Sequence, residues 1–470
     1  MYQMFRETQA MTSLDMSNWT TTSALTTVEQ MFFLSHLSTA DISSLTLTGL
    51  TNADNWFSSN TNLSSITIGT SLDDTPCTSW VNAFYNCALD ATSVNAILVA
   101  LDTAGQSNGT LDLDGGTNAV PDLATGWIAA AALRDAGWTV TTNETDFVML
   151  VTTTGAAETF TIPCQDSGTF NATIEWGDGE ADSTITAYND ADLAHEYADA
   201  GTYAIRISGT FPNIYFYGDA TEAAKVQSVE NLGSLSWTKL NNAFRGCTGM
   251  TRFVSGNTDT SAVTDIEGMC RDNTVVDCDY DLSTFNITGV TVEPKYVFYT
   301  SKVGSLDVTG AGWVWGAISL GQLFQSMAGT ATTLDLTGWN VASVTSMTGL
   351  FRGCSAPMTI DMTGWDTGNV TTMYLMAYQT ATITLTGMED FDITALTGGA
   401  STGLYWFGNS LIDNSITNYD TMLVNFAAQK ASTPTTMECH FGANKHDGAG
   451  TTAYDELITY GWTIADGGAV

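Results

Sequence analysis

Residues 349–373 read GLFRGCSAPMTIDMTGWDTGNVTTM, and the pattern in this stretch recurs along most of the chain. It joins an apolar pair, whose second member is usually Phe (the repeat Phe), to a strand-like apolar-x-apolar triplet. The pairs recur about every 26 residues and are Met4-Phe5, Met31-Phe32, Trp56-Phe57, Ala83-Phe84, Ala243-Phe244, Met269-Cys270, Val297-Phe298, Leu323-Phe324, Leu350-Phe351, Leu375-Met376 and Trp406-Phe407. The triplets are Leu14-Asp15-Met16, Leu45-Thr46-Leu47, Ile66-Thr67-Ile68, Leu306-Asp307-Val308, Leu334-Asp335-Leu336, Ile360-Asp361-Met362 and Ile383-Thr384-Leu385. Such a period predicts a solenoid, in which each coil buries its apolar side against its neighbours.

The charge balance of the chain limits its partners. The 470 residues include 13 Lys and Arg against 50 Asp and Glu, which gives a net charge of −37. Such a charge repels nucleic acid and anionic membranes, so neither is an expected partner. Only 13% of the residues are charged, because Thr, Ser, Asn and Gly supply most of the polar surface. We expect an extracellular β-rich protein with two or more domains and, without an apolar run of about 18 residues, no insertion into a membrane.

The first residues align with the middle of a coil. Placing MYQMFRETQAMTSLDMSNW on MTGLFRGCSAPMTIDMTGW pairs Met1 with Met347. A solenoid that begins inside a coil exposes apolar edges and normally needs a cap. The opening MYQMFRETQ also lacks the basic and apolar segments of a secretory signal. We therefore expect upstream sequence to be missing, together with any signal peptide or anchor.

Two stretches interrupt the coils in the same way. Residues 88–142 and 412–466 each contain a helical apolar pattern, a strand, a second helical pattern and a closing strand. The closing strands contain Trp138 and Trp462, which follow the last repeat Phe by nearly equal distances. We interpret both stretches as C-terminal α/β caps. The predicted domains are a repeat array truncated at its N-terminus (1–87), its cap (88–142), a β-sandwich (143–210), a second repeat array (211–411) and its cap (412–470).

The region between the two arrays has a different pattern. Short strand-like runs in residues 143–210 are joined by turn signals such as Gly177-Asp178-Gly179, which favours a small β-sandwich. The order EWGDG (175–179), AHEY (194–197) and AGTYAIRISG (200–209) resembles the polycystic-kidney-disease (PKD) type of immunoglobulin-like domain. The resemblance implies that His195 is structural. We expect the last strand, near 203–207, to continue into 211–217 and cover the open start of the second array.

The repeats also resemble a known family. NAFRGCTGM (242–250), residues 349–373 and MTSLDMSNWTTTSALTTVEQMF (11–32) are similar to the BspA-like leucine-rich-repeat surface proteins. The resemblance covers about two thirds of the chain and implies surface display and adhesion, as in bacteria and some protists; similar repeats occur in phage proteins. The expected fold is therefore mainly β with short helices: two leucine-rich-repeat-like solenoid arrays, each closed by an α/β cap and separated by a PKD-like sandwich.

The cysteines and histidines do not occur in the sequence motifs of known catalytic or zinc sites. The eight cysteines form no C-x-x-C pair, so no zinc site is expected. Three of them follow the repeat Phe by three residues, where we expect buried free thiols; disulfides are the alternative, with Cys77 and Cys87 closest in sequence. The four histidines are scattered, and no G-x-S-x-G, H-E-x-x-H or phosphate loop occurs. We expect no enzymatic activity and name no catalytic residue.

Acidic residues supply the candidate binding site. Asp15, Asp307, Asp335 and Asp361 lie in the middle of their triplets, so they are expected to point away from the coil interior. The predicted ligand-binding row is Asp307, Asp335, Asp361 and Thr384, with Trp339 and Trp365 following their strands; the alternatives are hydrogen-bonded Asp residues without a ligand and tryptophans packed inside the coils. Asp277, Asp279 and Asp281 alternate along a strand and are candidates for Ca²⁺, although an EF-hand glycine and glutamate are missing. No other cofactor is expected.

Two classes of function agree with this sequence. The first is a non-enzymatic binding or adhesion protein on a cell surface or virion, either a bacterial adhesin or a phage or virion fibre component. Its partner would be a host or cell-surface protein or a glycan. The second is a structural spacer or a self-assembling fibre or lattice protein. Exposed aromatic residues on one face would favour binding, whereas large apolar ends would favour assembly.

Overall fold

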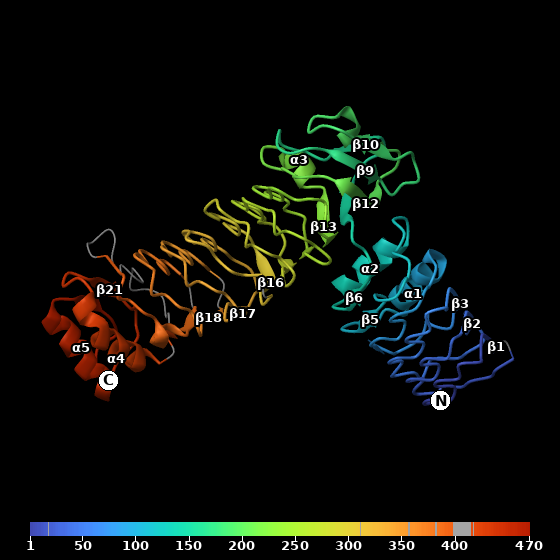
Figure 1. The fold of residues 1–470 in the computed structure, drawn as a ribbon, viewed down its shortest axis with the longest axis horizontal. Coiled ribbons are helices and arrows are strands. Elements are labelled where there is room, and N and C mark those ends of the chain that lie inside the picture. Colours follow the sequence, from blue (N-terminus) through green and yellow to red (C-terminus); the bar gives the residue numbers. More distant parts are fainter. Residues whose placement is uncertain (17, 311, 356–357, 381–382, 398–414, 417) are drawn as a thin grey trace. The chain divides into compact units, whose positions relative to one another are not determined.

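The computed structural model describes residues 1–470 except 17, 311, 356–357, 381–382, 398–414 and 417. The described part is mainly β with a few short helices, as predicted (Figure 1). Its residues form two compact units. The first contains residues 1–145, 176–181 and 202–206, and the second contains residues 146–175, 182–201 and 207–470.

Short parallel strands begin the first unit. β1 (Ser13–Asp15), β2 (Thr39–Asp41) and β3 (Ser65–Thr67) form one sheet in that order. Leu14 lies opposite Ala40, and Ala40 lies opposite Ile66, so equivalent residues of successive repeats are stacked. The triplet at 45–47 is therefore not the strand of its repeat. Alanine in the central position of β2 hides the apolar signal that marks the other strands.

Helices alternate with the next parallel strands of the first unit. β4 (Ser79–Trp80), β5 (Thr110–Asp112) and β6 (Thr139–Thr141) form a second sheet, with α1 (Ala91–Ala104) and α2 (Gly126–Asp135) between its strands in sequence. The carboxylate of Asp90 caps α1 by accepting a hydrogen bond from the Ser93 N–H. Gly105 ends that helix in the left-handed conformation, with φ of 65°.

Antiparallel strands follow. They are β7 (Phe147–Thr153), β8 (Glu158–Thr161), β9 (Asn171–Glu175), β10 (Ser183–Ile185), β11 (Ala194–Tyr197) and β12 (Gly201–Thr210), with a 3-10 turn η1 at Ala191–Leu193. β8 pairs with β11, which places His195 opposite Phe160, and β9 pairs with β10. The His195 ring also packs edge-on against Tyr197, with 4.8 Å between centroids.

Strand β7 connects these strands to a parallel ladder. It pairs antiparallel with β13 (Val226–Asn231), which pairs parallel with β14 (Arg252–Val254). One sheet of eight strands results, in the order β10-β9-β12-β7-β13-β14-β15-β16, with β15 at Cys278–Asp281 and β16 at Val303–Asp307. The segment 211–217 lies against the first repeat as expected, since the Phe211 N–H donates to Leu235 O. The strand that pairs with that repeat is β7, however, because its apolar run FVMLV suits burial on both faces.

A separate parallel sheet follows in the second unit. It contains β17 (Thr333–Asp335), β18 (Thr359–Asp361), β19 (Thr384–Thr386) and β20 (Ser415–Ile416). The remaining elements are α3 (Ala220–Ala223), η2 (Met388–Asp390), α4 (Tyr419–Gln429), η3 (Lys430–Ser432), β21 (Glu438–His440), α5 (Gly448–Tyr460) and β22 (Thr463–Ala465). β21 and β22 pair in parallel, and Trp462 beside them is 3% exposed.

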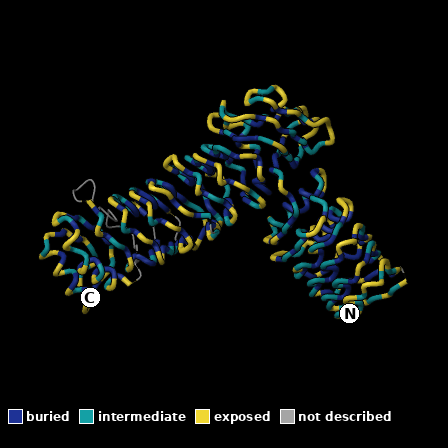
Figure 2. The backbone as a smooth tube through the Cα atoms, in the orientation of Figure 1, coloured by how far each residue is buried: buried dark blue, intermediate teal, exposed yellow. Residues whose placement is uncertain are grey.

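Stacked aromatic rings form the core of the repeats. The rings of Phe298, Phe324 and Phe351 lie 5.7 Å apart from centroid to centroid and are fully buried. Trp339 and Trp365 are 3% exposed and also stack, so they pack inside the repeats rather than forming a surface. Buried segments accordingly alternate with exposed ones along the backbone (Figure 2). The predicted burial of the repeat Phe residues is confirmed for these rings, whereas the pair 406–407 lies outside the described residues.

The cysteines are free thiols, as expected, and do not form the disulfides that were the alternative. All eight are free, and seven are buried. The thiols of Cys87 and Cys354 donate to the carbonyls of Phe57 and Phe324, the repeat Phe residues of the preceding repeats, at 3.1 and 3.0 Å. Burial raises the pKa of both thiols to about 12. These side chains therefore act as small, protonated core residues.

Candidate functional site

The predicted acidic residues lie at the ends of short strands. Asp307, Asp335 and Asp361 are the last residues of β16, β17 and β18. Each Oδ1 accepts two hydrogen bonds from the threonine two positions later, at 3.0 Å from the backbone N–H and 2.6 to 2.7 Å from the hydroxyl. Asp41 and Asp281 make the same pair of contacts with serines. Such contacts close Asx-type turns, so these carboxylates already have a structural role.

Thr384 does not lie in the predicted row. It lies opposite Thr359, whereas Thr386 is the residue opposite Asp361. The prediction was wrong because side chains two positions apart share one face of a strand, so alternation alone cannot choose between 384 and 386. Position 386 carries no Asp that would have marked the register.

The predicted row is also interrupted. Asp307 lies opposite Asp281 in the eight-stranded sheet, and Asp335 lies opposite Asp361 in the separate sheet. Asp307 and Asp335 are 28 positions apart, whereas Asp335 and Asp361 are 26 apart, so the repeat between the two sheets is longer by two residues. Strand pairing therefore places Asp307 beside Asp281 and Asp335 beside Asp361, and no ladder of the described residues joins Asp307 to Asp335.

Each of the three calcium candidates accepts a hydrogen bond from a nearby hydroxyl group. Asp279 and Asp281 alternate with buried Cys278 and Tyr280, which places both carboxylates on the outer side as expected. Asp279 Oδ1 accepts a hydrogen bond from the hydroxyl of Ser305 at 2.7 Å, and Asp277 Oδ2 accepts one from Thr330 at 2.8 Å. Within the described part of the chain, no group of three or more His, Cys, Asp or Glu residues is arranged to hold a metal ion.

A column of arginine and tyrosine side chains, which the sequence analysis missed, runs along the second unit. The residue after each repeat Phe lies beside its counterpart in the next repeat, because backbone hydrogen bonds run from Phe244 N–H to Met269 O and from Gly246 N–H to Arg271 O. By the same bonds Phe216 takes the Phe position before Phe244, and Ala377 takes it after Phe351, so the predicted pair 375–376 is one residue too early. The same bonding connects the following repeats. The members of this Arg–Tyr column are Tyr217, Arg245, Arg271, Tyr299, Gln325, Arg352 and Tyr378. Tyr217 is 51% exposed and the others are half-buried, so the column forms part of the surface.

Contacts within the column position its first arginines. The guanidinium of Arg245 lies 4.0 Å from the ring centroid of Tyr217, and that of Arg271 lies 4.8 Å from the ring centroid of Tyr299. Asp272 binds both arginines, with Oδ2 at 2.9 Å from Arg245 Nε and 3.3 Å from Arg271 Nε. Cation–π contact and ion pairing thus hold both side chains and partly neutralise them.

Arg352 has a different environment. Its guanidinium lies 5.6 Å from the ring centroid of Tyr378, and no carboxylate of a described residue lies within ion-pair distance of it. The segments 318–327, 343–355 and 369–380 carry Gln325, Arg352 and Tyr378, and we call these three segments the Arg352 panel. They contain no Asp or Glu, and Arg352 is their only charged residue. In a chain with 50 acidic residues, this panel is a local exception.

The first unit has an arginine at the equivalent position. Arg6 follows the repeat Phe of its repeat, and its guanidinium lies 5.3 Å from the ring centroid of Phe33. Unlike Arg352, it is paired, since its Nε lies 3.0 Å from Glu7 Oε1 and its Nη1 donates to Gln30 at 2.7 Å. The sequence signal for Arg6 and for the Arg–Tyr column is the residue directly after the repeat Phe, a position occupied by Arg or Tyr in most of these repeats.

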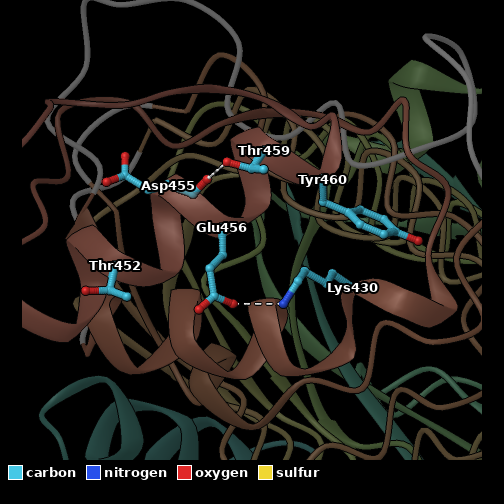
Figure 3. A pocket seen from close by; sticks show the side chains of 6 residues that line it. All are labelled: Lys430, Thr452, Asp455, Glu456, Thr459 and Tyr460. Carbon is cyan, nitrogen blue, oxygen red and sulfur yellow. Dashed lines mark hydrogen bonds and ion pairs between the residues drawn. The ribbon is translucent and has the colours of Figure 1, made fainter.

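A shallow depression lies beside α5 (Figure 3). It has a volume of about 570 Å³ and is lined by Lys430, Thr452, Asp455, Glu456, Thr459 and Tyr460. Its polar groups bind one another, because Lys430 Nζ lies 2.8 Å from Glu456 Oε2 and the Thr459 hydroxyl donates to the Asp455 carbonyl at 2.7 Å. In Figure 3 the Asp455 carboxylate points away from that ion pair. The six lining residues include neither His nor Cys, so they offer no nucleophile paired with an imidazole base.

A polar cluster near the end of the chain is enclosed. His446 Nδ1 lies 3.0 Å from the Thr451 hydroxyl, and His446 Nε2 lies 3.7 Å from Asp466 Oδ2. Tyr419 donates to the same Asp466 oxygen at 2.8 Å. Although a hydroxyl, an imidazole and a carboxylate are the residue types of a nucleophilic triad, the His446 and Asp466 side chains are only 4% and 3% exposed. The cluster therefore connects α4, α5 and the residues after β22.

Comparison with known proteins gives one match. A family model described as "Mycoplasma protein of unknown function, DUF285" matches residues 1–69, 214–314 and 318–433. These ranges include every member of the Arg–Tyr column and leave out residues 143–210. No curated protein and no solved structure matches the chain. In the described residues, no helix has both the length and the apolar character needed to cross a membrane.

Proposed function

The chain belongs to the DUF285 family, whose model matches more than half of its length, and from this premise we propose that it is an extracellular, non-enzymatic binding protein that attaches to a partner through a repeat-built surface. It is displayed on a cell surface or virion, as a bacterial adhesin or a phage or virion fibre component. The partner is a host or cell-surface protein or glycan.

The architecture proposed for this role is two solenoid arrays of the BspA-like leucine-rich-repeat type. Stacked parallel strands and the stacked Phe rings support the arrays. The helices and strands within 88–142 and 412–470 support α/β caps, and the antiparallel strands β7 to β12 support a PKD-like sandwich between the arrays. A rigid scaffold of this kind holds equivalent side chains of successive repeats at a constant spacing.

The observation that carries the proposal is the Arg–Tyr column. Tyrosine and arginine, together with tryptophan, are enriched among the residues that dominate binding energy in protein interfaces. Three of the chain's seven arginines lie in the column, each beside a tyrosine ring. The acidic pairs fit binding less well, because their Oδ1 atoms are already used to close turns. We therefore assign the binding surface to the column rather than to Asp307, Asp335 and Asp361.

A structural spacer is the second candidate. It is favoured by the eight-stranded sheet, which connects the strands of the proposed sandwich to the first repeats of the second array without a flexible linker. A protein that only sets a distance, or that assembles with copies of itself into a fibre or lattice, needs this stiffness and no exposed binding column.

Attachment of protein-coated beads to cultured cells separates the candidates. We compare the wild type with a column variant, Tyr299→Ala with Arg352→Ala and Tyr378→Ala, and with a charge variant, Asp307→Asn with Asp335→Asn and Asp361→Asn. The expected result is saturable attachment that the column variant loses and that the charge variant and a chelator leave unchanged. Loss in the charge variant alone would move the site to the acidic pairs. Absence of wild-type attachment, with ordered filaments or lattices seen by electron microscopy, would favour the spacer.

A further inference from the structure

We propose that the Arg352 panel binds a carboxylated sugar, with the guanidinium of Arg352 contacting the carboxylate and the side chains of Gln325 and Tyr378 contacting the rest of the ligand. This inference rests on the proposed binding function and names the ligand class of one part of the column.

Charge is the first argument. The protein carries −37 overall, which disfavours anionic ligands over most of its surface. The Arg352 panel has no acidic residue and one cation. Because Arg352 has no carboxylate partner among the described residues, a ligand carboxylate can pair with it without displacing one. Arg245 and Arg271 lack this property, since Asp272 already binds both.

The geometry of arginine is the second argument. A guanidinium offers a planar fork of N–H donors that matches a carboxylate with two parallel hydrogen bonds. The ring of Tyr378, 5.6 Å from the Arg352 guanidinium carbon, holds that fork near the surface on a rigid repeat. Gln325 and Tyr378 belong to the repeats on either side of Arg352, so an amide and a phenol flank the cation. The Gln325 side-chain amide oxygen is buried, so this residue would contact a sugar as a donor through its Nε2. The phenol of Tyr378 can both donate to and accept from sugar hydroxyls.

The surface chemistry favours a sugar over a peptide. Peptides usually bind by adding a strand to a free sheet edge or by placing apolar anchors in pockets. The backbone of the panel is already used between its own repeats, as in Leu320 N–H to Ser346 O and Met347 N–H to Thr372 O. No large apolar side chain is exposed in 318–327, 343–355 or 369–380, all of which are described. A surface rich in Ser and Thr hydroxyls, with one cation and no exposed large apolar side chain, therefore suits an acidic sugar.

The spacing of the repeats agrees with a linear glycan. Neighbouring parallel strands are about 4.8 Å apart, which is close to the length of one pyranose ring in a linear chain. Gln325, Arg352 and Tyr378 occupy three successive repeats, so the panel spans a short oligosaccharide. One carboxylate per acidic sugar then fits one arginine in the centre of the panel.

The test measures binding of the full chain to short oligogalacturonates by calorimetry, with neutral galacto-oligosaccharides, a sialylated oligosaccharide and poly-glutamate as comparison ligands. Arg352→Gln is the main variant and Arg352→Lys keeps the charge without the fork. Arg6→Gln is the matched control, because Arg6 has the same repeat position but is paired with Glu7. Thermal unfolding of each variant shows whether the fold is retained.

We expect the wild type to bind at least one of the two acidic sugars and not the neutral one, and the comparison of uronate with sialoside identifies the source of the carboxylate. Arg352→Gln should weaken binding about tenfold or more, Arg352→Lys should weaken it less, and Arg6→Gln should leave it unchanged. Binding should also weaken as salt rises.

Four outcomes would overturn the inference: equal binding of acidic and neutral sugars, no binding of either acidic sugar, tighter binding of poly-glutamate, or an unchanged affinity in a folded Arg352→Gln variant. If cell attachment still depended on the column in those cases, only this inference would fail and the proposed function would stand.

Discussion

Asp335 and Asp361 lie opposite each other on neighbouring parallel strands, and each carboxylate closes the turn that follows its own strand. Like charges on adjacent strands, about 4.8 Å apart, disfavour each other. The hydrogen bonds that each Oδ1 accepts from the following threonine offset this repulsion. The acidic pair is therefore part of the fold, and its removal should be visible as a loss of stability.

Replacing Asp335 by alanine should lower the free energy of unfolding by about 1 kcal/mol, because the backbone N–H and hydroxyl of Thr337 lose their acceptor. Asp335→Asn should cost clearly less, since an amide oxygen can accept the same hydrogen bonds. Chemical denaturation of both variants measures the difference. Equal destabilisation by the two substitutions would mean that charge, not turn closure, is the contribution of this residue.

Acidification should destabilise the protein partly through Asp361. Hydrogen bonds from Thr363 lower the pKa of this carboxyl in the folded state. A lowered folded-state pKa means that the unfolded chain binds the proton first, so this stabilisation is present above the unfolded pKa and is lost as pH falls through the folded pKa. Asp361→Asn should show a smaller fall in melting temperature than the wild type over that acidic range. Superimposable pH profiles would contradict this assignment.

Phe351→Ala should destabilise the second unit by about 3 to 5 kcal/mol, because the ring is fully buried between its neighbours. The ring of Phe324 lies 5.7 Å away, so the loss of packing should extend to the adjacent repeat. Hydrogen exchange should then increase in residues 318–327 as well as in 343–355. Phe351→Leu, which retains most of the apolar volume, is the control and should cost less. Exchange confined to the mutated repeat would argue against coupling between neighbours.

Cys87 and Cys354 should not react with a thiol reagent at about pH 8 while the protein is folded, since burial raises the pKa of both thiols to about 12. Reaction should follow unfolding by denaturant. A raised folded-state pKa also means that the folded state keeps protons that the unfolded chain loses above about pH 9, so stability should fall as pH rises from about 9 towards 12. Cys354→Ala provides the comparison in both measurements, and rapid labelling of the folded wild type would refute the buried-thiol assignment.

The sequence alone determined the features that depend on local pattern. A period of about 26 residues placed Phe324 and Phe351 in the core, because each repeat buries the same side of its backbone. The same pattern identified the buried free thiols and the outward direction of Asp335 and Asp361. These predictions succeeded because burial and strand alternation are properties of one repeat and need no knowledge of its neighbours.

Only the tertiary structure decided which residues of different repeats lie side by side. Register between strands depends on backbone hydrogen bonds across repeats, so Thr386 rather than Thr384 lies opposite Asp361. The repeat between Asp307 and Asp335 is longer by two residues, and their strands β16 and β17 do not pair. Alternation along a single strand does not reveal which strands pair. The Arg–Tyr column has the same origin, because Arg352 and Tyr378 become neighbours only when successive repeats are stacked by those hydrogen bonds.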